Sequence, residues 1–295
     1  MRRFISCLLI CLLLISAAAS AEEEPVYFVQ NAEADCFGRM VVTYDTPTLK
    51  YTIETFLMSG GVRCYLTRVW MKDPARQFRT VTGKWKKSLE FPKTFATKLP
   101  ESKLLINGSG YVSPQFPEIP DNYPGESKDY FYTPLGSLTV TDGEVFRNLE
   151  GVPYYGLILT DDGLQMITGD NNEDVLAMKP IQTWSFYTTC PMLRNNEDLL
   201  PEEWVFADRR AARTCIARLD KHNYLIFNAR EDTMGGISLR RVLIFFRNNF
   251  PKAEWVYNLD GGPSSALLCR EQGKKKARTL MGGGAKDADC MAFIE

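Results

Sequence analysis

An aspartate followed by two glycines ends an apolar run near the end of the chain, and this stretch holds residue types suited to chemistry. The stretch reads Val256-Tyr257-Asn258-Leu259-Asp260-Gly261-Gly262-Pro263-Ser264-Ser265. Adjacent glycines allow a sharp bend and a close approach of the backbone to a ligand. A carboxylate and two hydroxyls at such a bend are suited to holding a sugar or a phosphate. The same residues also fit an ordinary Asp-Gly turn between two strands.

Three side chains are the candidate catalytic residues. Asp260 is predicted to act as a base, a nucleophile or a transition-state stabiliser, and the alternative is that it only caps a turn or binds sugar hydroxyls. Arg213 is predicted to hold a phosphate, because its planar fork matches phosphate oxygens. The alternative for Arg213 is a structural salt bridge across a sheet. Asn107 is predicted to hydrogen-bond the sugar or the phosphate.

Seven further residues are predicted to contact the substrate. The glycines would let backbone amides approach the substrate, because they carry no side chain. The serine hydroxyls would form hydrogen bonds with the substrate, and the arginine would add positive charge. These residues are Gly108, Gly110, Gly261, Gly262, Ser264, Ser265 and Arg230. The two serines equally fit plain strand positions. The segment 107–109 is formally a glycosylation sequon, but a glycan there would block the site, so we expect none.

The scarcity of histidine excludes several hydrolase classes. His222 is the single histidine of the chain and falls in an expected turn. Phosphodiesterases that need two histidines, and histidine-rich metal sites, are therefore disfavoured. A Gly-x-Ser-x-Gly elbow is also absent from the sequence. Carboxylates remain as the reactive groups, which fits glycoside hydrolysis. No metal site and no cofactor are predicted, although assistance by a divalent ion stays open.

Four segments, in order, resemble elements of the phosphodiester glycosidase family. They match its Ile-Asn-Gly-Gly-Phe-Phe, Pro-Arg-Thr-Ala-Ile-Gly, Gly-x-Ser-Leu and Asn-Leu-Asp-Gly-Gly-Gly-Ser elements at residues 105–111, 212–217, 236–239 and 258–264. The resemblance implies a phosphodiester glycosidase-like domain over residues 100–295. It also implies cleavage of the sugar C1–O bond in N-acetylglucosamine-1-phosphodiester-like substrates.

The chain departs from that family pattern at several positions. Pro263 stands where a third glycine is usual, which removes a backbone donor. Ser109 replaces a glycine and Gly110 an aromatic residue. These changes motivate an alternative, a catalytically degenerate protein of the same fold that binds a glycan or polysaccharide of the cell envelope. A third interpretation is a structural envelope protein held together by disulfides.

Strand-type runs dominate the rest of the sequence. They include residues 27–29, 40–44, 62–66, 138–140, 155–159, 164–167, 213–217, 224–228, 255–259 and 266–269. Asp161-Asp162-Gly163 predicts a hairpin turn. Residues 238–248 carry apolar residues at helical spacing, with Ser238 as a possible cap. Residues 84–98 fit a helix or a surface hairpin. The mixture predicts an α+β fold with a mixed or mostly antiparallel sheet and few helices.

The first 21 residues have the pattern of a secretory signal peptide. Arg2 and Arg3 precede an apolar run, and Ala19-Ser20-Ala21 fits a cleavage site. A retained anchor is the alternative, but the run is short for a membrane span. We therefore expect a secreted or periplasmic protein without stable membrane insertion. A β-rich region at residues 22–99 would pack on the domain at 100–295.

Charge and cysteine content complete the expectations. Removing Arg2 and Arg3 takes the net charge from −1 to −3, which gives no electrostatic reason to expect nucleic acid. The expected partner is a glycosyl phosphodiester or polysaccharide substrate. Six cysteines remain after cleavage, and an exported chain with an even count predicts disulfides. They are Cys36, Cys64, Cys190, Cys215, Cys269 and Cys290, of which Cys215 best fits a buried thiol.

Overall fold

The structure is a computed structural model that describes residues 39–58, 60–115, 127–186, 190–231 and 235–295. All of these residues fall within one compact unit, Asn31–Glu295. The expected signal peptide and the expected strand at 27–29 lie outside the described residues. Among the helices that the structure describes, none is long and apolar enough to cross a membrane.

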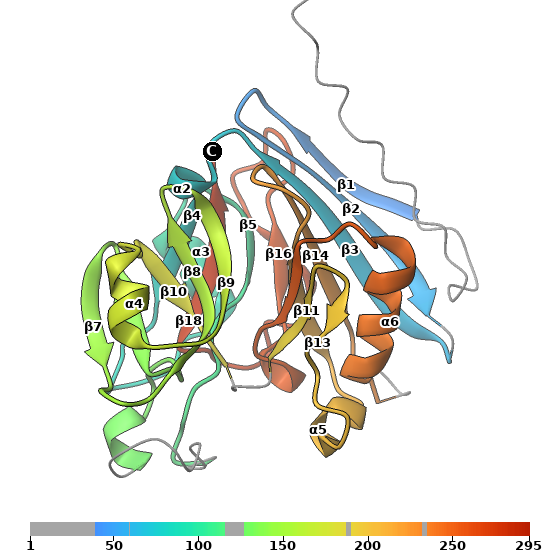
Figure 1. Cartoon of the computed structure of the whole chain (residues 1–295). Coiled ribbons are helices and arrows are strands. Elements are labelled where there is room, and N and C mark those ends of the chain that lie inside the picture. The colour runs from blue at the N-terminus through green and yellow to red at the C-terminus, as the bar shows by residue number, and fades with distance from the viewer. Residues whose placement is uncertain (1–38, 59, 116–126, 187–189, 232–234) are drawn as a thin grey trace, which may run out of the picture. The chain divides into compact units, whose positions relative to one another are not determined.

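Eight strands form the largest sheet, in the order β1-β2-β3-β14-β13-β15-β11-β12 (Figure 1). Their bounds are β1 Arg39–Asp45, β2 Leu49–Met58, β3 Val62–Met71, β11 Pro191–Arg194, β12 Glu197–Asp198, β13 Arg213–Arg218, β14 Asn223–Ala229 and β15 Trp255–Asn258. Every neighbouring pair in this sheet is antiparallel. The pairing of β3 with β14 joins the first described strands to the C-terminal half of the chain. The domain boundary expected at residue 100 stays a prediction.

Three smaller sheets complete the β structure, and all their pairings are antiparallel as well. One has the order β17-β16-β5-β18-β4, with β4 Phe78–Thr82, β5 Ser102–Asn107, β16 Leu267–Cys269, β17 Arg278–Met281 and β18 Asp289–Ile294. Another has the order β10-β8-β9, with β8 Tyr154–Thr160, β9 Gly163–Asp170 and β10 Gln182–Trp184. The last pairs β6 Leu138–Thr141 with β7 Glu144–Asn148.

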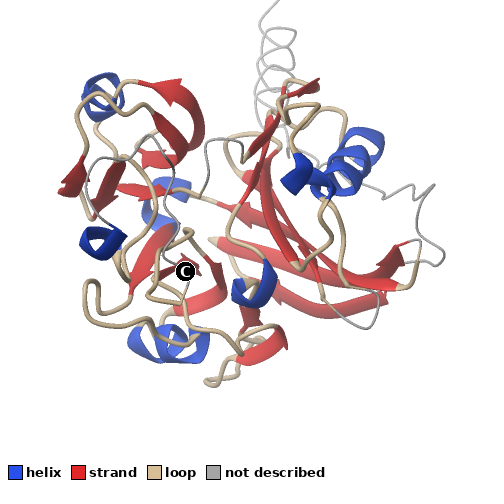
Figure 2. Cartoon of the chain, turned by 90° about the horizontal axis from the view of Figure 1, so that it is seen from below, coloured by secondary structure: helices blue, strands red, loops and turns tan. Residues whose placement is uncertain are grey.

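The helices are short, and strands are the commonest secondary structure among the described residues (Figure 2). The α-helices are α2 Pro74–Gln77, α3 Pro92–Lys98, α4 Asn172–Ala177, α5 Val205–Asp208 and α6 Leu239–Asn249, and two 3-10 turns are η1 Ser127–Tyr130 and η2 Gly262–Ser264. The predicted α+β fold with a mostly antiparallel sheet is therefore confirmed. The hairpin predicted at Asp161-Asp162-Gly163 joins β8 to β9. For residues 84–98 the sequence fitted either a helix or a surface hairpin. The structure has an isolated antiparallel bridge between Lys84 and Ser88, followed by the helix α3.

The helix predicted from residue 238 is α6. Its N-cap is Ser238, whose hydroxyl accepts a hydrogen bond from the N–H of Arg241. Phe245 turns to the large sheet, where its ring lies 5.6 Å from that of Phe56 on β2 and 5.1 Å from that of Phe227 on β14. These aromatic contacts fix α6 against the face of the sheet (Figure 1).

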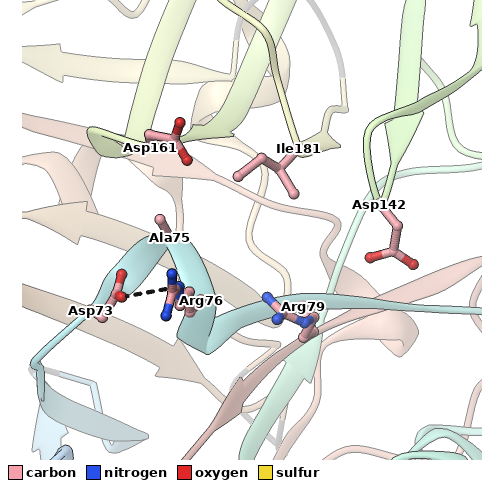
Figure 3. A pocket seen from close by; sticks show the side chains of 7 residues that line it. All are labelled: Asp73, Ala75, Arg76, Arg79, Asp142, Asp161 and Ile181. Atoms are coloured by element: carbon pink, nitrogen blue, oxygen red, sulfur yellow. Dashed lines mark ion pairs between the residues drawn. The ribbon is translucent and has the colours of Figure 1, made fainter.

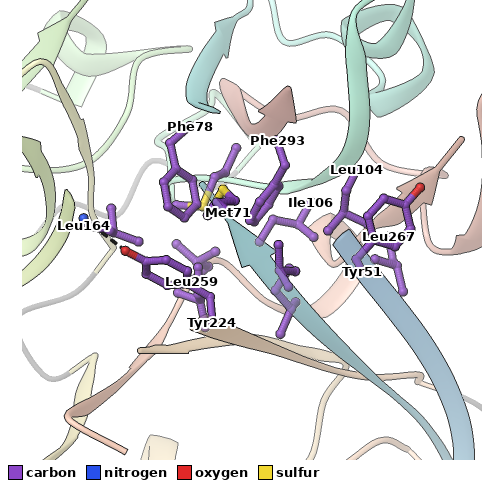
Figure 4. Close-up of a cluster of buried hydrophobic side chains, with 14 of the residues drawn as sticks. Tyr51, Met71, Phe78, Leu104, Ile106, Leu164, Tyr224, Leu259, Leu267 and Phe293 are labelled. Atoms are coloured by element: carbon purple, nitrogen blue, oxygen red, sulfur yellow. Dashed lines mark hydrogen bonds between the residues drawn. The ribbon is translucent and has the colours of Figure 1, made fainter. Parts of the chain in front are cut away.

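Side chains from several sheets meet in one large hydrophobic core. Phe78 of β4 is one of its members, and its ring centre lies 5.1 Å from that of Tyr224 and 4.9 Å from that of Phe293 (Figure 4). Leu259, the residue before Asp260, is fully buried in the same core (Figure 4). The core therefore anchors the polypeptide immediately before the candidate catalytic aspartate.

The prediction of disulfides is wrong for the cysteines that the structure describes. Cys64, Cys190, Cys215, Cys269 and Cys290 are all buried, and none of them forms a disulfide with another described cysteine; Cys36 lies outside the described residues. Each of the five sits among packed strand residues, where cysteine behaves as a small apolar side chain. Burial raises the pKa of Cys215, as expected for a thiol in an apolar strand.

Candidate active site

Asp260 lies where three strands end or begin. The chain leaves β15 at Asn258, and the N–H of Leu259 still bonds the carbonyl of Thr214 on β13 at 2.9 Å. The next N–H, that of Asp260, points instead to the carbonyl of Gly108, just after β5, at 3.3 Å. The side chain of Asp260 is therefore placed at a junction between the two larger sheets.

Asn107 fixes the loop that carries Asp260. Its side-chain amide donates to the carbonyl oxygen of Asp260 at 2.8 Å, and its Oδ1 accepts from the N–H of Ala266 at 3.0 Å. Asn107 is fully buried. The two bonds hold both ends of the segment 260–266. The structure thus brings Asn107 next to Asp260, with its amide engaged by the loop backbone.

Asp260 is half-buried as a residue, and its carboxyl is unusually basic. Burial is the largest cause and raises its pKa from the usual 3.8 to about 7. The hydroxyl of Ser264 and the N–H of Gly261 oppose this rise, and the N–H donates to Oδ1 at 2.7 Å. Asp289 adds a smaller upward effect, and the Arg213 guanidinium a downward one. A carboxyl that titrates near neutral pH is suited to proton transfer.

Two aspartates that sequence reasoning missed lie beside Asp260. Asp289 opens β18 and is 1% exposed; it accepts the N–H of Ser109 at 2.6 Å and its hydroxyl at 3.0 Å. Burial raises the pKa of Asp289 to about 6. Asp287 is also 1% exposed, and neither of its carboxyl oxygens makes a hydrogen bond. Burial raises the pKa of Asp287 well above its usual range, and Asp260 adds to this effect.

Tyr111 is a further group at the site that sequence reasoning did not select. Its ring is partly exposed. Burial raises the pKa of its phenol, and its neighbours include Asp260, Ser264 and Asp287. The phenol therefore stays protonated at neutral pH and is a donor at the edge of the carboxyl group cluster.

The glycines at 108 and 110 permit close packing inside the protein. A Cβ at Gly108 would lie 2.1 Å from Oδ1 of Asp289, and one at Gly110 would lie 2.0 Å from the ring of Phe186. The N–H of Gly110 donates to the carbonyl of Ser185 at 2.9 Å. These contacts explain the two glycines without a ligand, and they seat Ser109 against Asp289.

Arg213 is nearly fully buried at the start of β13, with 1% of its surface exposed. Its Nε donates to the carbonyl of Ile237 at 3.3 Å, and its Nη2 donates to that of Arg209 at 2.6 Å. The guanidinium lies 5.0 Å from the ring centre of Phe206 on α5. Its Nη1 makes no hydrogen bond to the described residues and lies 3.5 Å from the position of a Cβ at Gly261. One donor of this arginine is therefore directed toward the Asp260 loop.

The remaining predicted contact residues form the loop after Asp260 and the end of β14. The loop makes a 3-10 turn, η2, in which the N–H of Ser264 bonds Gly261 and that of Ser265 bonds Gly262. Both serines are buried. Arg230, directly after β14, is exposed.

His222 lies at the opposite end of β14, about 20 Å from the site by strand length. It is half-buried, and its Nδ1 lies 2.9 Å from the carbonyl of Met71. The described residues contain no group of three histidine, cysteine or acidic side chains arranged to hold a metal ion.

Two surface clefts lie elsewhere and contain none of the candidate residues. One, of about 490 Å³, lies beside α2 and the β8–β9 turn, and charged residues including Asp73 and Arg76 line it (Figure 3). The other, of about 520 Å³, is formed by the basic loop 274–278 with Glu271. Both are lined by exposed ion pairs, Asp73–Arg76 and Glu271–Arg278, which contribute little binding energy.

Comparison with known proteins supports the fold. No family model matches the chain, and no curated protein matches it significantly. The catalytic domain of zebrafish N-acetylglucosamine-1-phosphodiester alpha-N-acetylglucosaminidase, auto-inhibited by its pro-peptide, matches with a TM-score of 0.61 and 16% identity, over 92% of this chain and 94% of that one. A hypothetical protein from Synechocystis matches with a TM-score of 0.55 and 12% identity, over 88% and 64%. This chain therefore shares the fold of a phosphodiester-linked sugar hydrolase domain.

Proposed function

We propose that this chain is a hydrolase that cleaves the sugar C1–O bond of glycosyl phosphodiesters, with N-acetylglucosamine-1-phosphodiester-like compounds as substrates. The observation that carries the proposal is Asp260, a half-buried residue whose carboxyl pKa is raised to about 7. It sits on a fold shared with an enzyme named for this reaction. Perturbed carboxyls of this kind are concentrated at catalytic sites.

Asp260 acts in this proposal as the base. Its carboxylate takes a proton from water, the water oxygen bonds C1, and the C1–O bond breaks with its electron pair on the phosphate oxygen. A phosphate monoester leaves readily, so a strong general acid is not required. The base form of Asp260 is needed, so the rate should rise as pH increases through about 7.

Arg213 is the proposed phosphate contact. Its Nε and Nη2 are fixed by backbone carbonyls, and Nη1 is the donor left for a ligand. A guanidinium held rigidly loses little entropy when it bonds an anion. Arg230 is exposed and follows Ala229, which pairs with Arg213 between β14 and β13, and it would add positive charge without a fixed geometry.

The test is hydrolysis of UDP-N-acetylglucosamine and a panel of α-glycosyl phosphodiesters, with and without chelator. Wild type should release free sugar, and Asp260→Asn should lower kcat by about 10²–10⁴-fold, the usual contribution of a positioned base. Arg213→Lys keeps the charge but loses the planar fork, so kcat/KM should fall by about 10-fold or more. Asp162→Asn, in the exposed β8–β9 turn, is the matched control and should keep full activity.

Full activity in Asp260→Asn would remove Asp260 from the mechanism. If folded wild type releases no sugar from any substrate, the second candidate gains weight, a glycan-binding protein of the same fold. That candidate is favoured by the loop 260–265, whose N–H groups bond the protein itself and whose Pro263 has none. Binding would then appear as an increase in Tm with glycan, without turnover.

The place of action is proposed to be the periplasm or the extracellular space. The pattern of residues 1–21 supports this. Fusion of this segment to a reporter, followed by N-terminal sequencing of the exported product, should give a start at Glu22. Retention of the reporter inside the cell would contradict the proposed location.

A further inference from the structure

Positive charge is concentrated in two segments of a chain whose overall charge is nearly balanced. Residues 84–103 and 271–286 contain eleven lysine and arginine residues and only three acidic ones, Glu90, Glu101 and Glu271. The formal net charge of the whole chain is −1. The rest of the chain is therefore acidic, and the position of the two segments in the fold decides whether their charges act together.

Both segments lie on the outer side of the five-stranded sheet. Successive residues of a strand point to opposite faces. On β5, Leu104 points into the large core, whereas Leu105 packs with Phe95 of α3 in a separate cluster. The helix α3 therefore covers the side of this sheet that faces away from the large core. Ala277, from the second segment, packs against the same separate cluster.

A buried arginine joins the two segments. Arg270 is 8% exposed, and it donates from Nε to the carbonyl of Ser102 and from Nη2 to that of Ala96 on α3, each at 2.7 Å. Its Nη1 donates to the carbonyl of Lys275. The rigid guanidinium holds these carbonyls in a fixed arrangement. The lysine run 274–276 is therefore attached to the first segment.

Eight lysines of this region are exposed and form no ion pair with the other residues that the structure describes. They are the four lysines of residues 84–93, the three of residues 274–276, and Lys286. The other cations of the region, Lys98, Lys103 and Arg278, are paired with acidic side chains. The positive charge of the eight lysines is thus available to an anionic partner.

Exposed aromatic rings lie among these lysines. Phe91 is 41% exposed, and Nζ of Lys286 lies 5.2 Å from its ring centre. Phe146 is 43% exposed, and its ring centre lies 4.5 Å from that of Trp85 and 5.9 Å from Nζ of Lys86. Lysine and phenylalanine on one surface are the combination that binds the interface of an anionic membrane. We call the eight lysines with Phe91 and Phe146 the basic face.

We propose that the basic face binds the surface of a membrane rich in anionic phospholipids, peripherally and reversibly. The lysines attract the headgroup phosphates, and the two phenylalanine rings enter the interfacial layer. Nucleic acid is the less suitable polyanion, because ten of the eleven cations are lysine and lack the planar fork with which arginine contacts bases and phosphates. This inference goes beyond the proposed function and does not depend on turnover.

The test is sedimentation of the exported protein with two kinds of vesicle, pure phosphatidylcholine and equal parts of phosphatidylcholine and phosphatidylglycerol. Wild type should bind the mixed vesicles and leave the pure ones unbound. Added salt should weaken the binding, because it screens exposed charges. Part of the binding should persist at high salt, because the apolar contacts of Phe91 and Phe146 are not screened.

Charge at the basic face is tested by a double variant, Lys274→Gln with Lys276→Gln. It should lower the partition coefficient by about 25-fold, since each lysine near an anionic surface contributes about fivefold. The matched control, Lys221→Gln with Lys252→Gln, removes the same charge from exposed turns beside β14 and β15 and should bind as wild type does. All variants share the same N-terminal residues, so differences between them report on the basic face.

The aromatic contribution is tested by Phe91→Ala with Phe146→Ala, which should remove the binding that persists at high salt. An unchanged Tm shows that the variant is folded. The proposal is overturned if wild type does not bind the mixed vesicles, or if the lysine control loses as much binding as the basic-face variant. Binding of DNA or polyphosphate without binding of vesicles would also overturn it, in favour of a soluble polyanion as the partner.

Discussion

The raised pKa of Asp260 predicts a specific dependence of stability on pH. Burial shifts this pKa from 3.8 to about 7 in the folded chain. Between these values the folded state keeps the proton that the unfolded state has lost. Stability is therefore fully present at low pH, falls as pH rises through this window, and is constant above it. Asp260 destabilises the protein at the pH where it would act as a base.

The magnitude follows from the shift of about three pH units. Each unit corresponds to about 1.36 kcal/mol, which gives about 4 kcal/mol as an upper value. Asp260 is partly exposed and solvent screens its interactions, so we expect about 2–4 kcal/mol. Asp260→Asn has no titrating group at this position. The free energy of unfolding of the variant should therefore gain about 2–4 kcal/mol relative to wild type between pH 4 and pH 8.

The assay is urea denaturation of wild type and Asp260→Asn at several pH values in that range. Asn retains the oxygen that accepts the Gly261 N–H, so the loop should keep its form. Asp162→Asn, for which no such gain is expected, controls for general charge effects. A difference between Asp260→Asn and wild type that stays constant with pH, or that shrinks as pH rises, would refute the account of Asp260 as a destabilised buried acid.

Three further predictions concern the surroundings of the site. Asp289→Ala should destabilise by about 1–3 kcal/mol more than Asp289→Asn in urea denaturation, because only the asparagine keeps an acceptor for the buried Ser109 N–H; equal losses would contradict this. Gly108→Ala should cost about 1–3 kcal/mol by overpacking, whereas Gly284→Ala, with open space at its Cβ, should be neutral, and similar Tm values would argue against the close contact. His222→Ala should leave kcat unchanged. A large loss of kcat in a folded variant would indicate a catalytic role for His222.

The sequence was informative about residues at the ends of apolar runs and about local helix signals. Asn107, Arg213 and Asp260 each stand at the end or the start of an apolar run, and the structure brings these strand ends to one junction. The apolar spacing and Ser238 predicted α6, because helix periodicity and capping are local properties. The sequence could not show that the described cysteines form no disulfides. A buried thiol and a disulfide-bonded cysteine have the same kind of apolar neighbours in the sequence.

The two additional aspartates could not be found in this way. Asp289 meets Ser109 across 180 positions, and only the register of β18 against β5 decides that contact. The available signal was weak. Asp287 and Asp289 lie two residues apart, ahead of the apolar run 290–294, a spacing that would place both on one face if the strand extended back to residue 287. Carboxylates on the same strand face as the apolar Met291 are expected to be buried with it. The sequence does not show which groups these carboxylates contact.

Pro263 sharpens the distinction between the two candidate functions. It lies in the first turn of η2, where its missing N–H would have no partner in the turn, so the loop keeps its form. The neighbouring N–H groups bond carbonyls or Asp260, so this loop presents few backbone donors to an anion. Recognition of a phosphate would then fall to side chains, to Nη1 of Arg213 and the phenol of Tyr111. The proposed hydrolase needs a base that titrates near neutral pH, so a measured pH dependence of stability at Asp260 is the result that would support chemistry over binding.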